Sequence, residues 1–271
     1  MQPKTSRAFL VCLALLCVQA SFAEAQTAVP VEPLTASSTT AAPGAETALP
    51  TSVEILDKYE AATGGHDAWS RFKTRSTRGI YQSEDESTFA GIEILNESPN
   101  KMSTTITFPN GASIRETCDG KSAWAEDSGG NIHEFTGVQL ESILRDSAFG
   151  NRAEVLRQMG PGRVSGISRV GTHSVYVVEF SPEKDISSKA FFDTDSGFIV
   201  RTDDTFHRPD GDHIVETDFD DYSTVDGAYF PFRMRHVERG NVFTVHVIQV
   251  KNNAPVDETV FEKAGAAPGE Q

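Results

Sequence analysis

Short apolar runs alternate with polar turns over most of the chain, and the pattern is clearest from Phe191 to Phe261. The runs there are rich in Val, Ile, Phe and Tyr, and turns such as Thr194–Gly197, Val225–Gly227 and Glu238–Asn241 separate them. Asp226-Gly227 is the strongest turn signal, because tight hairpins need positive φ angles that Gly, Asn and Asp adopt at low cost. The pattern predicts a meander of antiparallel strands.

Alternation within the runs predicts which side of the sheet is buried. Every second residue of a strand points to the same face, and in these runs one set is large and mostly apolar while the other is charged or small. Arg233 and Arg235, for example, share the predicted solvent-exposed face with Asp218 and Asp220. The inward set comprises Met102, Thr104, Ile106 and Phe108, then Val215, Thr217 and Phe219, then Phe230, Phe232, Met234 and His236.

Two helical regions interrupt the strand pattern. The first opens with Thr51-x-x-Glu54, which reads as a capping box, and Gly64-Gly65 stops it. We expect Val53, Leu56 and Tyr59 on its buried side, followed by a short helical piece over 67–72. The second region combines apolar residues at near-helical spacing, namely Val138, Leu140, Ile143, Leu144 and Ala148, then Val155, Leu156 and Met159.

The remaining runs complete the prediction of a mainly β, α+β fold. About eleven strands are expected, with one helical region in front and the other midway. An open antiparallel sheet of that length does not stay flat, so it should curl around its apolar face with the helices as the cover. The expected strand runs outside the C-terminal meander cover 74–81, 88–95, 101–108, 113–118, 122–126, 131–135, 163–170 and 173–180.

The first residues predict export. Lys4 and Arg7 precede an apolar run over 8–18, and Ala23-Glu24-Ala25 provides a small-x-small cleavage site, so 1–25 reads as a secretory signal peptide. Residues 26–52 form an Ala, Thr, Ser and Pro-rich stretch with too few large side chains to order itself, and 265–271 a disordered tail. We therefore expect one folded domain over 53–264, located in the periplasm.

The cysteines fit this interpretation. Cys12 and Cys17 lie within the signal, and a lipid on Cys17 is disfavoured because Leu16 stands where a small residue is needed. Cys118 would then be the remaining cysteine, which rules out an internal disulfide. It lies on an alternating strand and is expected to be a buried, unreactive thiol.

The formal net charge of −15 narrows the possible partners. An acidic surface repels phosphate backbones and anionic lipid headgroups, so nucleic-acid binding and electrostatic membrane docking are both disfavoured. The acidic residues are scattered along strands and turns, which is typical of a solvated face.

Catalytic patterns are weak. Asp195-Ser196-Gly197 has the letters of an aspartic protease loop, but Phe198 follows where a small residue belongs and the chain holds no second copy. His207 and His213 flank two aspartates and could ligate a divalent metal, with a solvated turn as the favoured interpretation. We therefore expect no metal, no cofactor and no enzymatic activity.

Several segments together resemble the outer-membrane lipoprotein-sorting (LolA-like) superfamily of periplasmic proteins. They are 55–81, Asp119–Trp124, Phe192–Arg201, Asp221–Gly227, Phe230-Pro231-Phe232 and the tail Asn253-x-Pro255-x-Asp257-x-x-x-Phe261. The resemblance covers 53 to about 263 as an ordered set. It implies an open half-barrel wrapped on helices that act as a lid over an apolar cavity for acyl chains. The basic residue that latches the lid in the best-known carriers has no matching motif around Arg71, Arg75 or Arg78.

The functional hypothesis is a periplasmic, non-enzymatic carrier or binder of a lipophilic ligand. The expected partner is a lipid or lipoprotein acyl chain, with a membrane-protein donor or acceptor as a further candidate, and the protein is expected to be a monomer. The alternatives are a metal-dependent or hydrolytic enzyme on the same scaffold and a protein-interaction module that uses its sheet edge. The predicted ligand-binding residues are Met102, Ile106, Phe108, Leu140, Leu144, Phe230, Phe232 and Met234.

Overall fold

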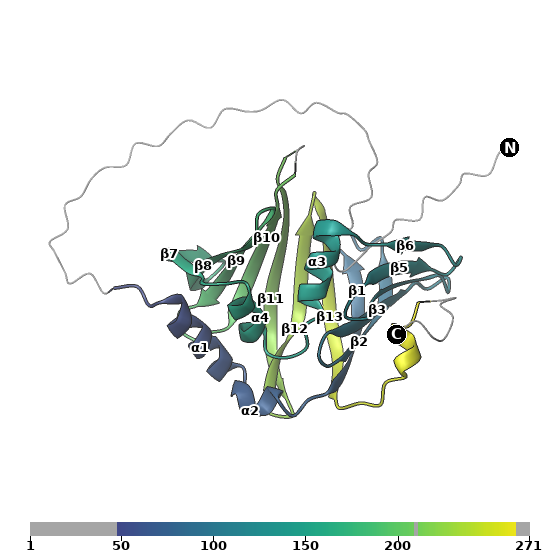
Figure 1. Ribbon diagram of the computed structural model, residues 1–271, viewed down its shortest axis with the longest axis horizontal. Coiled ribbons are helices and arrows are strands. Elements are labelled where there is room, and N and C mark those ends of the chain that lie inside the picture. The colour runs from purple at the N-terminus through teal and green to yellow at the C-terminus, as the bar shows by residue number, and fades with distance from the viewer. Residues whose placement is uncertain (1–47, 209–210, 264–271) are drawn as a thin grey trace.

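One antiparallel sheet of 13 strands dominates the computed structural model, which describes residues 48–208 and 211–263 (Figure 1). The predicted signal peptide, nearly all of the predicted linker and the predicted tail lie outside the described residues. The strand order is β6-β5-β4-β3-β2-β1-β13-β12-β11-β10-β9-β8-β7, so the first strand pairs with the last at the centre. The strands are β1 (Thr74–Ser83), β2 (Phe89–Glu97), β3 (Lys101–Thr107), β4 (Ser113–Cys118), β5 (Ala123–Asp127), β6 (Ile132–Glu134), β7 (Arg163–Val170), β8 (His173–Glu183), β9 (Ile186–Asp193), β10 (Ile199–Phe206), β11 (His213–Val225), β12 (Ala228–Glu238) and β13 (Asn241–Asn252).

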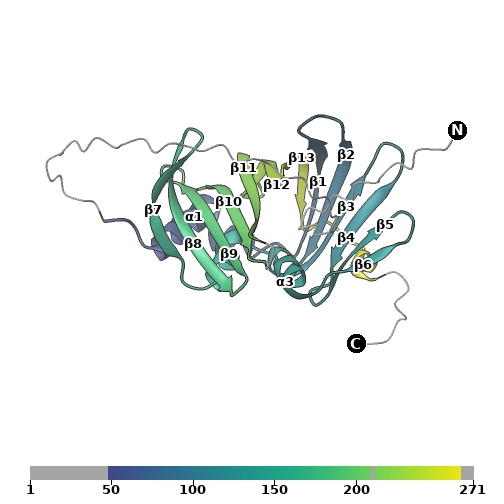
Figure 2. The ribbon, with the colours of Figure 1, turned by 90° about the horizontal axis from the view of Figure 1, so that it is seen from above.

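Helices stand before β1, between β6 and β7, and after β13. They are α1 (Ser52–Ala62), α2 (Gly65–Trp69), α3 (Gly137–Asp146), α4 (Arg152–Gln158) and the 3₁₀ helix η1 (Glu258–Phe261). Seen from above, the two halves of the sheet turn toward each other, and α3 lies across the open side (Figure 2). The edge strands β6 and β7 are not paired with each other, so the sheet is an open half-barrel, as expected.

The hairpin turns form where the sequence predicts them. Asp226 and Gly227 have φ angles of 54° and 88°, and β11 pairs with β12 right up to them, from Val225 to Ala228. Arg239 and Gly240, with φ of 46° and 78°, close the β12–β13 hairpin in the same way. Positive φ at both central residues gives the turn a twist that matches the flanking strands.

The central β1–β13 pair carries a bulge next to Gly79. The register shifts between Arg78 and Gly79, so Ile248 on β13 has no partner. A Cβ atom at Gly79 would stand 2.5 Å from the backbone oxygen of His246, closer than real contacts allow. Glycine is therefore required where the two halves of the sheet join.

The first helix begins as predicted but buries a slightly different face. The Thr51 hydroxyl accepts a hydrogen bond from the Glu54 amide at 3.2 Å, and the Glu54 carboxylate accepts one from the Thr51 amide at 2.7 Å, so the capping box is confirmed. Ile55 is buried with Leu56 and Tyr59, whereas Val53 is 61% exposed. The buried stripe is centred near Tyr59 on the helical wheel, which leaves Val53 on the flank.

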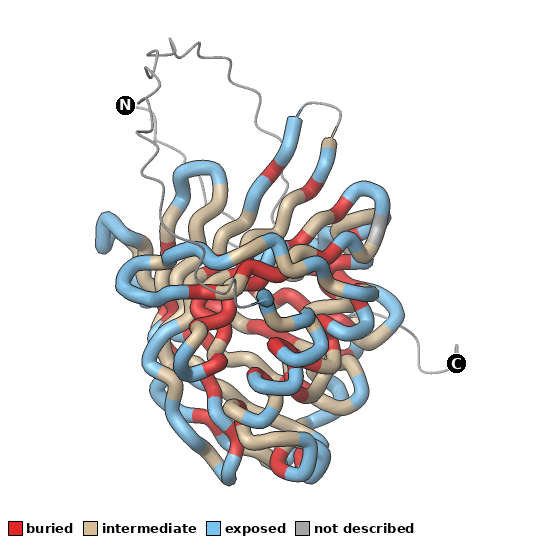
Figure 3. Tube along the Cα trace, turned by 90° about the vertical axis from the view of Figure 1, so that its left-hand side faces the viewer, coloured by how far each residue is buried: buried red, intermediate tan, exposed pale blue. Residues whose placement is uncertain are grey.

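The helices pack on the concave face of the sheet, and buried positions gather where the two layers meet (Figure 3). One cluster joins α1 and α4 to β8 and β9, through Leu56, Leu156 and Phe192. Another joins α2 to β12, and a third joins α3 to β4 and β5 around Cys118. Cys118 is fully buried, as predicted, and burial raises the pKa of its thiol.

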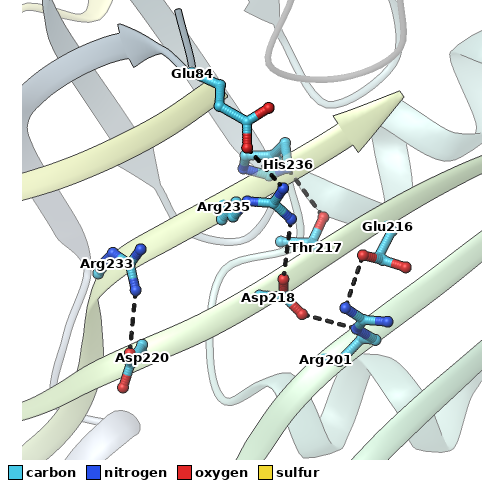
Figure 4. Close-up of polar contacts among 9 residues, drawn as sticks. All are labelled: Glu84, Arg201, Glu216, Thr217, Asp218, Asp220, Arg233, Arg235 and His236. Atoms are coloured by element: carbon cyan, nitrogen blue, oxygen red, sulfur yellow. Dashed lines mark hydrogen bonds and ion pairs between the residues drawn. The ribbon is translucent and has the colours of Figure 1, made fainter. Parts of the chain in front are cut away.

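The convex face carries the charges. Arg235 lies between Glu84 and Asp218, at 3.2 and 3.5 Å, and Arg201 lies between Asp218 and Glu216, each at 2.7 Å (Figure 4). Ion pairs at the protein surface contribute about 0 to 1 kcal/mol each, so these partly exposed pairs add little to the stability of the sheet.

The sheet holds more strands than the predicted count of about eleven. β9 begins at Ile186, before the predicted start at Phe191, because the polar run Ser187–Lys189 hides the strand pattern. Ser188 is nevertheless buried on the inward face.

Among the described residues, no helix has the length and apolarity that a bilayer crossing requires.

Candidate ligand-binding cavity

A cavity of about 370 Å³ lies between the concave face of the sheet and the covering helices. Its floor comes from strands of both halves, and its cover comes from Tyr59 on α1, Trp69 on α2, and Arg152 and Val155 on α4. Proteins bind small ligands in cavities of roughly 300 to 1,000 Å³, so the volume suits one slender ligand. The helices thus cover the apolar face without filling it.

Three of the eight predicted ligand-binding residues border this cavity. Met102 lies on β3, and Phe230 and Met234 lie on β12. Val215, Thr217 and Phe219 of the neighbouring β11 border it as well, which matches the inward set that alternation predicts. Whether these side chains bind a ligand stays a prediction.

The other five predicted residues pack nearby without bordering the cavity. Ile106 and Phe108 belong to a cluster around Tyr81 and Phe243, and Phe232 packs beside Phe230 and Val250. Leu140 and Leu144 of α3 pack on the cluster around Cys118. Leu144 also borders a separate hollow of about 510 Å³ between α3, α4 and the residues Pro99 and Asn100.

Arg75 is the most unusual side chain on the cavity wall. Its guanidinium lies 5.2 Å from the ring centre of Phe149, 5.3 Å from that of Phe230 and 5.9 Å from that of Trp69. It donates one long hydrogen bond, 3.5 Å, to Oδ1 of Asn96 on the adjacent strand. Burial lowers the pKa of Arg75 to about 10, which still leaves the group charged at neutral pH.

The second arginine on the cavity wall is paired. Arg152 at the start of α4 donates to the Asp146 carboxylate at the end of α3, at 3.2 Å. Asp204 on β10 faces the same region, and burial raises its pKa, with Asp146 adding to the effect and Arg152 opposing it. The charges of this wall therefore compensate one another.

His236 adds a neutral polar group to the floor. Its Nδ1 lies 3.0 Å from Oγ1 of Thr217 (Figure 4). Its ring stacks on Phe243 with centroids 4.8 Å apart. Burial lowers the pKa of His236 to about 4, although the nearby Asp218 opposes this shift. The imidazole is therefore uncharged at neutral pH.

Thr63 fixes the cover to the end of the sheet. Its carbonyl oxygen accepts from the Tyr229 amide at 3.0 Å and from Trp69 Nε1 at 2.9 Å. Its hydroxyl accepts from Nδ2 of Asn151 at 2.8 Å, and the Asn151 side chain in turn caps α4. One buried residue thus ties the α1–α2 corner, the start of β12 and the loop before α4 together.

Sequence reasoning placed the polar residues Thr104, Thr217 and His236 on the inward face but missed the arginine of the cavity wall, Arg75, and its aromatic neighbours. Alternation along β1 places Arg75, Thr77 and Gly79 on the face of the buried Tyr81, so Arg75 could have been assigned inward from that residue. Trp69 and Phe149 could not, because they contact Arg75 from a short helix and a loop without periodicity.

The alternative catalytic sites take other roles. Asp195-Ser196-Gly197 forms the β9–β10 turn, where Oδ1 of Asp193 accepts from the Ser196 amide and hydroxyl at 2.7 and 2.8 Å. Those bonds and one from His173 outweigh burial and lower the pKa of Asp193 to about 2. The turn therefore has a structural explanation.

The histidines of the second alternative lie beside different carboxylates. His207 pairs with Asp212 at 2.8 Å, and the buried His213 lies 2.9 Å from Glu238. Asp210, between them, lies outside the described residues. Within the described part of the chain, the side chains that come close enough to share a metal ion are Glu60, His66 and Glu154, and Glu60 is ion-paired with Arg157.

The protein thus belongs to the class of open antiparallel half-barrels in which helices cover a concave, partly apolar cavity. No protein-family profile matches the sequence, and no curated protein matches it. Solved structures match the fold. A LolA superfamily protein from Nitrosomonas europaea superposes with a TM-score of 0.54 at 11% identity, over 79% of this chain and 99% of that chain.

Two further structures agree with this match. A DUF1329 family protein from Desulfovibrio piger gives a TM-score of 0.54 at 11% identity, over 78% of this chain and 96% of that chain. An outer membrane lipoprotein-sorting protein domain from Vibrio parahaemolyticus gives 0.52 at 11% identity, over 77% and 95%. At this identity the likeness concerns the fold, and it confirms the LolA-like resemblance at that level.

Proposed function

We propose that the protein is a periplasmic, non-enzymatic carrier or binder of a lipophilic ligand, whose acyl chain it holds in the cavity beneath the helices. The observation that carries the proposal is the cavity itself, because a fully packed helical cover would leave no such space. The likeness to a lipoprotein-sorting domain supports the same ligand class and the same compartment.

The size of the apolar contribution supports carriage. Burying about a dozen methylene groups at ~0.8 kcal/mol each releases roughly 10 kcal/mol before ordering costs. Met102, Phe230 and Met234 offer the apolar wall for such a chain. A lipid or lipoprotein acyl chain is therefore the ligand class, and a membrane-protein donor or acceptor is a further candidate partner.

Substitution in β12 tests the proposal. Met234→Ala removes cavity wall, so it should weaken the binding of a fluorescent fatty acid several-fold with little effect on unfolding. Phe232→Ala, two residues away, removes packing outside the cavity and should cost about 3 kcal/mol of stability. Ile248→Ala, at a side chain that is 65% exposed on β13, should change neither.

Native mass spectrometry of protein purified without detergent supplies the second measurement. Bound lipid is expected on the wild type. The carrier proposal fails if no lipid co-purifies, no fatty acid binds, and Met234→Ala unfolds the protein. Activity lost on chelation would favour the metal-enzyme alternative, and a stable protein complex without lipid would favour the interaction module.

A further inference from the structure

One arginine of the cavity wall has no carboxylate partner. Arg75 lies on its wall, and among the described residues no carboxylate stands within ion-pair distance of the guanidinium. The other arginine of the wall, Arg152, has Asp146 at 3.2 Å. A guanidinium has five N–H donors, and the hydrogen bond from Arg75 to Asn96 uses one of them.

The surroundings of Arg75 compensate its charge partly. The rings of Trp69, Phe149 and Phe230 stand 5.2 to 5.9 Å from it, a range in which cation–π attraction operates. Such contacts hold the guanidinium in a fixed place and satisfy none of its hydrogen-bond donors. The three rings also come from three separate elements, α2, the α3–α4 loop and β12, so the cationic group is fixed by the cover and the floor together.

None of the acidic residues described along the same cavity forms an ion pair with Arg75. Asp146 pairs with Arg152, and Asp204 faces that pair from β10. Glu116 lies on β4, with β2 and β3 between it and the strand of Arg75. The polar neighbour of Arg75 on the adjoining strand is Asn96, whose side-chain amide contributes no charge.

We infer that Arg75 is the receptor for the anionic head group of the ligand, and that the ligand is a single-chain amphiphile ending in a carboxylate or phosphate. The planar guanidinium can donate two parallel hydrogen bonds to such an oxyanion, the geometry in which arginine binds these groups most strongly. The acyl chain then runs along the apolar wall past Phe230 and Met234. This assignment rests on the proposed lipid-binding function.

Three probes with the same chain test the assignment: laurate, dodecyl phosphate and dodecanol. Binding is followed by the fluorescence of Trp69, which borders the cavity, in a Trp124→Phe background. The wild-type cavity should bind one of the two anions at least about tenfold more tightly than dodecanol, because a charge-assisted hydrogen bond is worth about 1.5 to 3 kcal/mol. The preferred anion identifies the head group.

Arg75→Met removes the charge and keeps an apolar side chain of similar length. It should abolish the preference for the anion while dodecanol binds as before, and Arg75→Lys should restore part of it. The matched control is Arg78→Met, on the same strand but on the convex face, where Arg78 pairs with Glu93 at 2.7 Å. It should keep the wild-type preference, and thermal unfolding checks that all three variants are folded.

The outcomes separate the two proposals. Equal binding of anions and dodecanol by the wild type, or an anion preference that survives in Arg75→Met, overturns the role of Arg75 and leaves the carrier function standing. If none of the three amphiphiles binds the wild type, the carrier function itself is wrong.

Discussion

Arg75 and Arg78 stand three positions apart on one strand, yet their side chains lie in different environments. Arg78 points outward and pairs with Glu93, as Arg201 and Arg235 pair with their carboxylates on the same convex face. Arg75 points inward to aromatic rings. Substituting a charged residue of a strand should therefore change the stability little where the side chain lies on the convex face and much more where it lies on the concave face.

The pKa of His236 likewise depends on the environment of its side chain, and its shift predicts how stability responds to pH. In the unfolded chain its pKa is near 6.5, whereas in the folded protein burial lowers it to about 4. The unfolded state thus binds the proton more readily, so stability should fall as the pH drops from about 6.5 toward 4. Because the ring is partly accessible from the cavity, we expect a loss of about 1 to 3 kcal/mol.

Urea unfolding at pH 7 and at pH 4.5 measures this effect. His236→Gln, which carries no titratable group, should show a smaller difference between the two pH values than the wild type does. The control is His246→Gln on the exposed face of β13, which should keep the wild-type difference. An unchanged difference in His236→Gln would contradict the assignment.

At this scale the sequence predicts apolar positions better than polar ones. Met102 and Met234 fall on the inward face because strict alternation leaves no other choice. The burial of Cys118 follows from the same pattern. Thr217 is placed inward by the same alternation, but Asn96 is a buried polar residue that the predicted inward set does not contain.

Among the elements, the corner between α1 and α2 positions the cover. Gly64 has a φ of 111°, and a Cβ atom there would stand 2.4 Å from the backbone oxygen of Gly227 in the β11–β12 turn. The close approach lets the Thr63 carbonyl reach the Tyr229 amide. Two turns far apart in the sequence therefore interlock through a pair of glycines.

Gly64→Ala should consequently destabilise the protein by about 2 to 4 kcal/mol, because it adds backbone strain and a steric clash that neither turn can relieve. Chemical denaturation measures the loss. The control is Gly91→Ala on β2, where the new methyl group would have 3.9 Å to its nearest neighbour. That variant should unfold like the wild type, and equal stability of all three proteins would refute the interlocking role.

Element types were predictable where local chemistry decides them. The capping box at Thr51 and the Asp226-Gly227 turn depend on residues next to each other, and both are present. β9 was harder, since Ser187–Lys189 joins the sheet through its neighbours β8 and β10 and not through its own pattern. Tertiary pairing overrides weak local preference there.

For the whole molecule, the strand order and the cavity lay beyond the sequence pattern. Alternation gives each strand an inward face, but it cannot predict that β1 pairs with β13. Nor can it predict that the helices α1 to α4 leave a cavity of about 370 Å³ unfilled above the sheet. Those facts depend on how curved the sheet is and how far the helices stand from it. The half-barrel as a whole is nonetheless what the resemblance to the LolA-like superfamily implies.

The cellular location and the processing of the protein are a further prediction at this scale. The signal peptide should be removed after Ala25, so the mature protein should begin near Gln26 and behave as a monomer. N-terminal sequencing of protein from the periplasmic fraction, with size-exclusion chromatography of the same sample, measures both. Recovery of intact Met1, or of a lipid attached to Cys17, would contradict the cleavage.

The pairing of β1 with β13 bears on how the chain reaches this state. β1 is the first strand along the described chain and β13, its partner at the inner edge, is the last, so the contact between the two half-sheets can form only when the chain through β13 is available. Until then β1 offers unpaired backbone groups to any passing strand, the condition that favours aggregation. Correct assembly therefore depends on keeping that edge away from other chains until the final strand is in place.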